Sequence, residues 1–115
     1  KREFLMLVRT ARQYGKEQIA MIMETMCATG IRVSELKFFR VENIKGGVIR
    51  VWNKGKYRMV ILPEILRKKL LIYIGRNRIR SGVIFRTRTG REKNRSNIWK
   101  EMKKVAEKYG KNKTA

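Results

Sequence analysis

Arg32 is the first residue whose type and position could do chemistry. It follows Gly30 by two residues, and Gly30 is expected to end one helix just before the next one begins. The first turn of a helix exposes unpaired N–H groups and the positive end of the helix dipole, which suit a phosphate. A guanidinium there can hold two phosphate oxygens through parallel hydrogen bonds. Glu35, one turn further on, could orient Arg32, or the two side chains could form an ordinary surface ion pair.

A cluster of cations lies at the predicted tip of a β-hairpin. Lys54, Lys56 and Arg58 crowd one turn, which the packing of a core does not require, and the tip of a two-stranded ribbon can enter a DNA groove. Lys54 lies between Asn53 and Gly55, so the backbone can turn sharply there and direct the side chain outward. A lysine close to a phosphodiester could donate a proton to a leaving oxygen. A solvated hairpin tip with no ligand is the alternative.

Two further basic segments, 86–91 and 95–100, combine arginines with Thr, Ser and Asn side chains that can donate hydrogen bonds to phosphates. Trp99 lies off the expected inner face of the second segment, which does not by itself establish that it stacks on a base. The residues that we assign to DNA contact are Lys56 and Arg58 of the hairpin and, in these two segments, Arg86, Arg88, Arg95, Ser96, Asn97 and Lys100.

The periodicity of the apolar residues predicts the elements that must position these groups. Spacings of three and four residues favour helices over residues 4–15, 19–30, 33–39, 63–77 and from Asn94 or Ser96 to 109. Residues 48–52 and 59–62 are rich in β-formers and flank the basic turn, which predicts an antiparallel hairpin, and a short third strand is expected at 83–85. The sequence therefore predicts an α+β fold, mostly helical, with a small three-stranded antiparallel sheet.

The charge of the chain is strongly one-sided. Its 115 residues include 30 Lys and Arg and nine acidic residues, all Glu, which gives a formal net charge of +21. Residues 1–47 carry a net charge of +4 and residues 48–115 a net charge of +17. Such a field on a folded domain favours a polyanion, of which nucleic acid is the commonest. An anionic membrane surface, a solvated surface and a charge that serves assembly with other macromolecules are the alternatives.

The residue types exclude several kinds of site. With no His and no Asp, the chain has no His-based acid–base catalysis, no His-ligated zinc and no Asp-based magnesium or calcium site. The single cysteine, Cys27, cannot form an internal disulfide or a Cys-rich metal site. No apolar run approaches the roughly 18–20 residues that a membrane span requires, and there is no signal-peptide pattern. We therefore expect a soluble, cytoplasmic domain with no metal, no cofactor and no membrane partner.

Three segments together resemble the tyrosine recombinase (phage integrase) family. Residues 29–36, Thr-Gly-Ile-Arg-Val-Ser-Glu-Leu, are similar to the first catalytic arginine box of that family. Residues 49–58, Ile-Arg-Val-Trp-Asn-Lys-Gly-Lys-Tyr-Arg, are similar to its β-hairpin with the catalytic lysine. Ile84 and Phe85, followed by Arg-Ser-Asn-Ile-Trp at 95–99, are similar to the strand and helix that precede its second box. The order and spacing also match, and the similarity extends over about residues 4–110.

The resemblance implies DNA strand exchange without ATP or metal. In that family a tyrosine attacks the scissile phosphate to form a 3′-phosphotyrosyl link, two arginines stabilise the transition state, and a lysine protonates the departing 5′ oxygen. For this chain the resemblance implies that Arg32 is the first arginine, that Lys54 is the general acid and that Glu35 supports Arg32. Lys56 is the weaker candidate for the acid because it follows the glycine. The implied partner is double-stranded DNA, on which the family works as a homotetramer.

The sequence departs from the family at the second box. That box is His-x-x-Arg, followed by another His or Trp and then the nucleophilic Tyr, but this sequence contains no His. Its four tyrosines, at 14, 57, 73 and 109, all precede the expected place of the nucleophile. We expect residues 1–110 to be the first part of a catalytic domain cut from a longer protein, able to bind DNA but not to cleave it, with a frayed tail at 111–115. The alternative is a non-catalytic, basic nucleic-acid-binding module.

Overall fold

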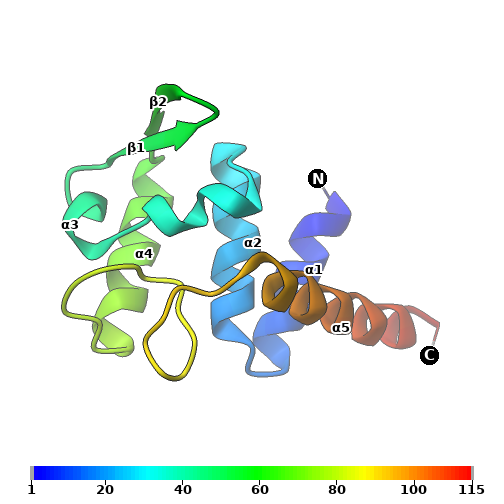
Figure 1. Cartoon of the computed structure of the whole chain (residues 1–115). Helices are drawn as coiled ribbons and strands as arrows, with labels where there is room; N and C mark the ends of the chain where they lie inside the picture. The colour runs from blue at the N-terminus through cyan, green and yellow to red at the C-terminus, as the bar shows by residue number, and fades with distance from the viewer. Residues whose placement is uncertain (1, 115) are drawn as a thin grey trace.

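Helix α2 (Glu17–Thr29) is the centre of the fold. The computed structural model describes the backbone of residues 2–114 and the side chains of residues 4–110. Residues 19–23 of α2 are all buried, so this helix is apolar around most of its circumference and has to be surrounded by other elements. Figure 1 shows α1 (Arg2–Gln13) and α4 (Glu64–Arg76) on either side of α2, and α5 (Arg95–Thr114) also packs against it.

Gly30 ends α2, as the sequence predicted. Its φ of 73° lies in the left-handed region that glycine adopts without steric cost, and its N–H donates to the carbonyl oxygen of Met26 at 2.8 Å. Arg32 is extended, and the chain then forms a short 3₁₀ helix, η1 (Val33–Phe38), which confirms the short helix expected after Arg32. A further helical turn, α3 (Val41–Ile44), was not predicted.

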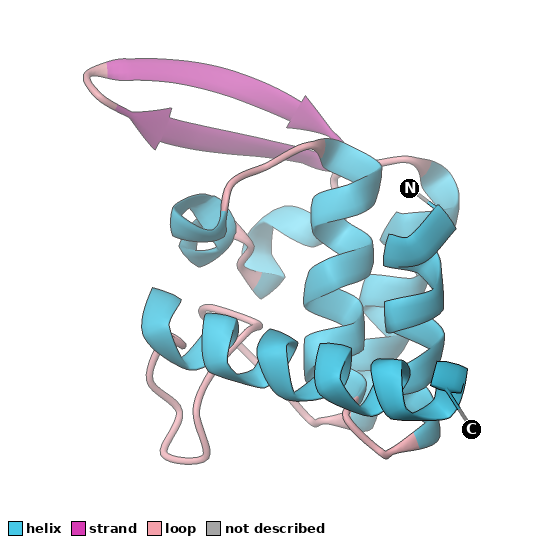
Figure 2. Ribbon diagram, turned by 90° about the vertical axis from the view of Figure 1, so that its right-hand side faces the viewer, coloured by secondary structure: helices cyan, strands magenta, loops and turns pink. Residues whose placement is uncertain are grey.

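Strands β1 (Val48–Asn53) and β2 (Lys56–Ile61) form the predicted hairpin, in a register that pairs Val48 with Ile61 and Asn53 with Lys56. One face carries Ile49, Val51 and Val60, which are buried, and β1 packs on η1 and α3. Figure 2 shows the ribbon projecting beyond the ends of the helices. The large apolar side chains of the other face are exposed: Val48, Trp52, Tyr57, Met59 and Ile61.

The prediction of a third strand at 83–85 is wrong, because the sheet has two strands. The segment makes only an isolated bridge between Val83 and Arg40, with a hydrogen bond from the Ile84 N–H to the Phe39 carbonyl oxygen at 3.0 Å. A longer ladder cannot form because α3 begins directly after Arg40. The apolar side chains of Ile84 and Phe85 belong to the buried core. The centroid of the Phe85 ring lies 6.4 Å from that of Phe39.

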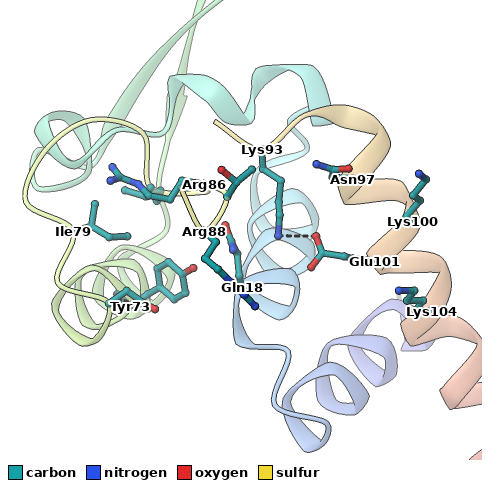
Figure 3. Close-up of a pocket in the computed structure, with 13 residues that line it drawn as sticks. Gln18, Tyr73, Ile79, Arg86, Arg88, Lys93, Asn97, Lys100, Glu101 and Lys104 are labelled. Atoms are coloured by element: carbon teal, nitrogen blue, oxygen red, sulfur yellow. Dashed lines mark hydrogen bonds and ion pairs between the residues drawn. The ribbon is translucent and has the colours of Figure 1, made fainter. Parts of the chain in front are cut away.

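The loop between α4 and α5 is closed by its own contacts and tied to α5. Arg86 bridges to Glu92 through the backbone, and Figure 3 shows the ion pair between Lys93 Nζ and Glu101 Oε2, 2.6 Å apart. Helix α5 begins after Asn94, whose side-chain Oδ1 accepts the Asn97 N–H at 2.8 Å, so Asn94 rather than Ser96 is the cap. The predicted frayed tail falls on the last residues of α5 and on residue 115, which lies outside the described residues.

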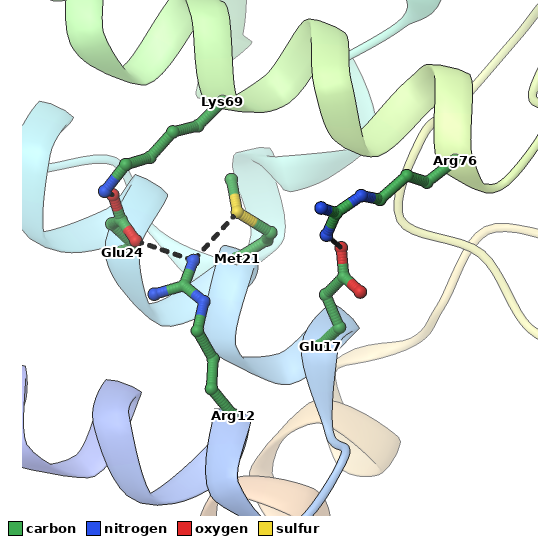
Figure 4. A network of polar contacts seen from close by, with 6 residues as sticks. All are labelled: Arg12, Glu17, Met21, Glu24, Lys69 and Arg76. Carbon is green, nitrogen blue, oxygen red and sulfur yellow. Dashed lines mark hydrogen bonds and ion pairs between the residues drawn. The ribbon is translucent and has the colours of Figure 1, made fainter.

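A network of ion pairs joins the first, second and fourth helices (Figure 4). Glu24 of α2 is only 15% exposed and accepts hydrogen bonds from Arg12 Nη2 of α1 at 2.9 Å and from Lys69 Nζ of α4 at 2.7 Å. Arg76 and Glu17 add a looser pair at 3.7 Å. Burial alone would raise the pKa of Glu24, but the bonds from Lys69 and Arg12 outweigh it and hold that pKa below its ordinary value.

Glu24→Gln is expected to lower the free energy of unfolding at pH 7 by about 1 kcal/mol, because it removes the charge that Arg12 and Lys69 share. Since the folded-state pKa of Glu24 is lowered, this contribution is fully present above its unfolded value of 4.5 and is lost as the pH falls through the folded-state pKa. Urea unfolding at a series of pH values measures it.

The matched control is Glu107→Gln, which removes an exposed carboxylate of α5 and so reports the general effect of one negative charge. An equal loss of stability in both variants, or a loss from Glu24→Gln that does not shrink as the pH falls, would contradict the role of this network.

Candidate active site

Arg32, Lys54 and Arg95 line one cleft of about 510 Å³, which we call the Arg32 cleft. Arg32 comes from the start of η1, Lys54 from the tip of the hairpin and Arg95 from the first turn of α5. Three segments far apart in the sequence thus bring three cations to one place. The other residues that line the cleft are Met26, Val33, Ser34, Asn53 and Trp99.

The guanidinium of Arg32 is available for a ligand. The side chain is exposed, and within the described residues it makes no hydrogen bond or ion pair. The backbone of the same residue is fixed, because its N–H donates to Glu35 Oε1 at 2.8 Å and its carbonyl oxygen accepts the Glu35 N–H at 2.9 Å. The arginine therefore combines a fixed backbone with an unpaired, bidentate hydrogen-bonding group, which suits a phosphate.

Lys54 occupies a strained position at the turn of the hairpin. Its φ is 51° and that of Gly55 is 79°, and positive φ values at both central residues are characteristic of the type I′ turn of two-residue hairpins. A residue with a Cβ pays about 1–2 kcal/mol in the left-handed region, and glycine or asparagine would fit better there. In this turn conformation Lys54 lines the Arg32 cleft, whereas Lys56, two residues on, does not.

The carboxylate of Glu35 connects the arginine box to the hairpin. Its side chain is only 1% exposed, and it accepts two hydrogen bonds from Arg58 of β2, to Oε2 at 2.5 Å and to Oε1 at 3.0 Å. With the bond from the Arg32 N–H, the carboxylate has three donors. The sequence predicted that Glu35 supports Arg32; in the structure it binds the Arg32 backbone, while its guanidinium partner is Arg58.

The Glu35–Arg58 pair stays charged at neutral pH. Burial alone would raise the pKa of Glu35, but the hydrogen bonds from Arg58 and from the Arg32 N–H outweigh it and lower that pKa. The bonds to Glu35 likewise raise the pKa of Arg58. The guanidinium of Arg58 already binds a buried carboxylate inside the protein. The assignment of Arg58 to DNA contact stays a prediction.

The other residues assigned to DNA contact divide between two sides of α5. Arg95 lines the Arg32 cleft, and Ser96 is exposed and lines neither cleft. A second cleft, of about 760 Å³, is lined by the remaining four, namely Arg86, Arg88, Asn97 and Lys100 (Figure 3). The guanidinium of Arg86 also holds its own loop, because it donates to the carbonyl oxygens of Val83 and Ser81 at 2.8 and 2.7 Å.

Sequence reasoning missed some of the residues that shape the site. Trp99 is 48% exposed and lines the Arg32 cleft, and Asn53 lies beside Lys54 at the end of β1. On the exposed face of the hairpin, the Trp52 and Tyr57 rings are 4.3 Å apart and the Arg50 guanidinium lies 4.2 Å from the Tyr57 ring. The alternation of the strand residues could have revealed this last cluster, whereas nothing in the sequence brings residues 95 and 99 to Arg32.

The part of the chain that the structure describes holds neither a metal cluster nor a membrane-spanning helix. No group of three or more His, Cys, Asp or Glu side chains is placed to hold a metal ion. No helix of the described chain is both long and apolar enough to cross a membrane.

Comparison with known proteins identifies the family and the fold of the chain. The model of the phage integrase family matches residues 2–115, so the chain belongs to that family. Among solved structures, the crystal structure of XerA recombinase has a TM-score of 0.75 and 21% identity, which shows a shared fold. The match covers 96% of this chain and 41% of the XerA chain, so this chain spans less than half the length of that protein. No curated protein matches the sequence.

Glu35→Gln is expected to loosen the hairpin, because it removes the charge that Arg58 pairs with and leaves an amide at a site built for a carboxylate. Since Arg58 is 47% exposed, the loss in the free energy of unfolding should be about 2 kcal/mol, below that of a fully buried pair. Hydrogen exchange measures the local effect, which should be a larger increase for the amides of residues 48–61 than for those of α4.

Glu64→Gln is the matched control, because Glu64 pairs with Arg67 inside α4 at 2.7 Å and does not touch the hairpin. Unchanged protection of the hairpin amides in Glu35→Gln, or the same change in both variants, would show that Glu35 does not couple the arginine box to the hairpin.

Proposed function

We propose that this chain forms part of the catalytic domain of a tyrosine recombinase and binds double-stranded DNA with the Arg32 cleft on a backbone phosphate. The observation that supports it most is the convergence of Arg32, Lys54 and Arg95 on one cleft. No carboxylate lines that cleft, so an anion would meet cations alone. Membership of the phage integrase family supports the same function.

Each cation has a distinct task in this proposal. The Arg32 guanidinium holds two non-bridging oxygens of the phosphate and stabilises the charge that develops on them in the transition state. Lys54 donates a proton from Nζ to the 5′ oxygen as the bond from phosphorus to that oxygen breaks. Arg95, which reaches the same cleft from α5, adds positive charge near the phosphate. Glu35 positions these groups through its bonds to the Arg32 backbone and to Arg58.

These 115 residues contain no His, so no His-x-x-Arg box lies within them. A second candidate is a module that binds DNA through the same basic cleft without cleaving it. The codons that follow Ala115 discriminate the two candidates: a His-x-x-Arg and a late Tyr favour the recombinase, and a stop codon favours the binding module. Assembly into a homotetramer on DNA also remains part of the recombinase proposal.

Binding of a DNA duplex to the 115-residue chain should depend steeply on salt. Contact with about six phosphates predicts a slope of about −5 for the logarithm of the association constant against the logarithm of the salt concentration, and Arg32→Ala should reduce that slope by about one. Fluorescence anisotropy with a labelled duplex measures both. Arg9→Ala, which removes an exposed arginine of α1, is the matched control. A slope near zero, or an equal reduction by Arg9→Ala, would contradict the proposal.

A nicked DNA substrate that traps covalent adducts tests the catalytic roles. In a chain extended through a following second box and tyrosine, Arg32→Ala and Lys54→Ala should each abolish the adduct while DNA affinity falls less than about tenfold, because the interactions lost in the transition state exceed the loss of one phosphate contact in binding. The 115-residue chain itself should form no adduct. Equal losses of binding and cleavage in the variants would indicate that these residues act through structure alone.

A further inference from the structure

The larger cleft on the other side of α5, which we call the α5 cleft, has no task in the proposed strand cleavage. Its volume of about 760 Å³ lies within the range of about 300–1,000 Å³ that is usual for small-ligand sites. At 3.6 residues per turn, Arg95 and Trp99 lie on one face of α5, whereas Asn97, Lys100 and Lys104 lie on the opposite face. The helix therefore separates the two clefts.

The α5 cleft carries more positive charge than its own carboxylate can neutralise. Glu101 is the only acidic residue that lines it, and Lys93 Nζ lies 2.6 Å from Glu101 Oε2 (Figure 3). The side chains of Arg88, Lys100 and Lys104 make no hydrogen bond or ion pair within the described residues, although all three line the cleft. Cationic side chains that line one cleft without an anionic partner favour the binding of an anion, and arginine and lysine bind phosphate especially well.

The inner end of the cleft offers hydrogen bonds and an apolar floor. Gln18 Oε1 is buried and has no hydrogen-bond partner, and the Tyr73 hydroxyl also makes no hydrogen bond within the described part of the chain. Burial raises the pKa of Tyr73 to about 12, so its hydroxyl stays protonated and can donate. Ile79 and Ile84 are buried and line the same cleft as Tyr73. Figure 3 shows Tyr73 and Gln18 facing Lys100 and Lys104 across the cleft.

We propose that the α5 cleft binds a nucleotide, with its phosphate on Arg88, Lys100 and Lys104 and its base against Tyr73, Ile79 and Gln18. A phosphate alone would satisfy the cations but leave the Gln18 amide unpartnered. A base edge carries both donors and acceptors, so it can complement that amide in either orientation. The nucleotide is either one unit of a DNA strand, in which case this inference rests on the proposed function, or a free nucleotide.

The contribution of the base is measured by titrating the ¹⁵N-labelled chain with dAMP, deoxyribose 5-phosphate and inorganic phosphate. We expect dAMP to bind at least about fivefold more tightly than the other two, with shifts at the residues that line the α5 cleft. Tyr73→Phe keeps the ring and removes the hydroxyl, and Gln18→Leu removes the amide. Each substitution should lower the affinity for dAMP toward the affinity for deoxyribose 5-phosphate. Equal affinity for all three probes in the wild type would overturn the proposal.

Two adjacent lysines of α5 provide the control for charge. Lys104 lines the cleft, whereas Lys103 is exposed and does not line it. Lys104→Gln should weaken dAMP binding about fivefold, as expected for the loss of one charge-assisted hydrogen bond at an exposed site, and Lys103→Gln less than about twofold. Equal effects of the two substitutions would mean that dAMP responds only to the overall charge, and would refute a built site.

Competition with DNA identifies the source of the nucleotide. Loss of the dAMP shifts on addition of a short duplex or single strand would show that a unit of DNA occupies the α5 cleft; DNA binding with the dAMP shifts retained would show a site for a free nucleotide. Both results support the α5 cleft as a nucleotide site. Arg32→Ala should weaken DNA binding and leave dAMP binding unchanged, so failure of the α5 cleft and failure of the proposed function are distinguishable.

Discussion

The geometry of the Arg32 cleft depends on one buried carboxylate. Glu35 accepts three hydrogen bonds, one from the backbone of Arg32 and two from Arg58, and so fixes the start of η1 against β2. The inner face of the hairpin packs on η1 and α3, but its tip, which carries Lys54, projects beyond the helices (Figure 2). A residue that does not itself line the cleft therefore supplies the polar link between the segment of Arg32 and the hairpin of Lys54.

The acidic residues divide the cations into two groups. Glu24, Glu35 and Glu101 each neutralise basic side chains that join separate elements, namely Arg12 and Lys69, Arg58, and Lys93. Those cations belong to the scaffold. The cations that line the two clefts without a partner in the described structure are Arg32, Lys54, Arg95, Arg88, Lys100 and Lys104. The net charge of +21 thus becomes a surface with two defined basic clefts, one on either side of α5.

Local chemistry made much of the fold predictable. Gly30 is the residue that a left-handed helix end requires, the basic turn suits a two-residue hairpin, and Asn94 can cap a helix; the structure confirms all three. The strand at 83–85 was wrong because a short apolar run looks the same in a strand and in a buried loop. Ile84 and Phe85 are buried as part of the core rather than paired in the sheet.

The spacing of the residues predicted the site only where they are neighbours in the sequence, whereas the resemblance also implied that Arg32 and Lys54 act together. The spacing of Arg32 and Glu35 suggested their association, but Arg58 is 23 residues from Glu35 and no periodicity links them. Arg95 reaches the Arg32 cleft because the loop after α4 returns α5 to η1, which is a property of the whole path of the chain. That Arg95 joins Arg32 and Lys54 in one cleft therefore follows only from the three-dimensional structure.

A double-mutant cycle tests most directly whether those cations act on one phosphate. The affinity of the chain for a DNA duplex is measured at fixed salt for Arg32→Ala, Lys54→Ala and the double variant, with Arg9→Ala paired to Arg32→Ala as the distant control. If both side chains bind the same phosphate, the two losses in binding free energy should fail to add by at least about 0.5 kcal/mol, while the control pair adds. Additivity of the Arg32 and Lys54 losses within about 0.3 kcal/mol would contradict a shared site.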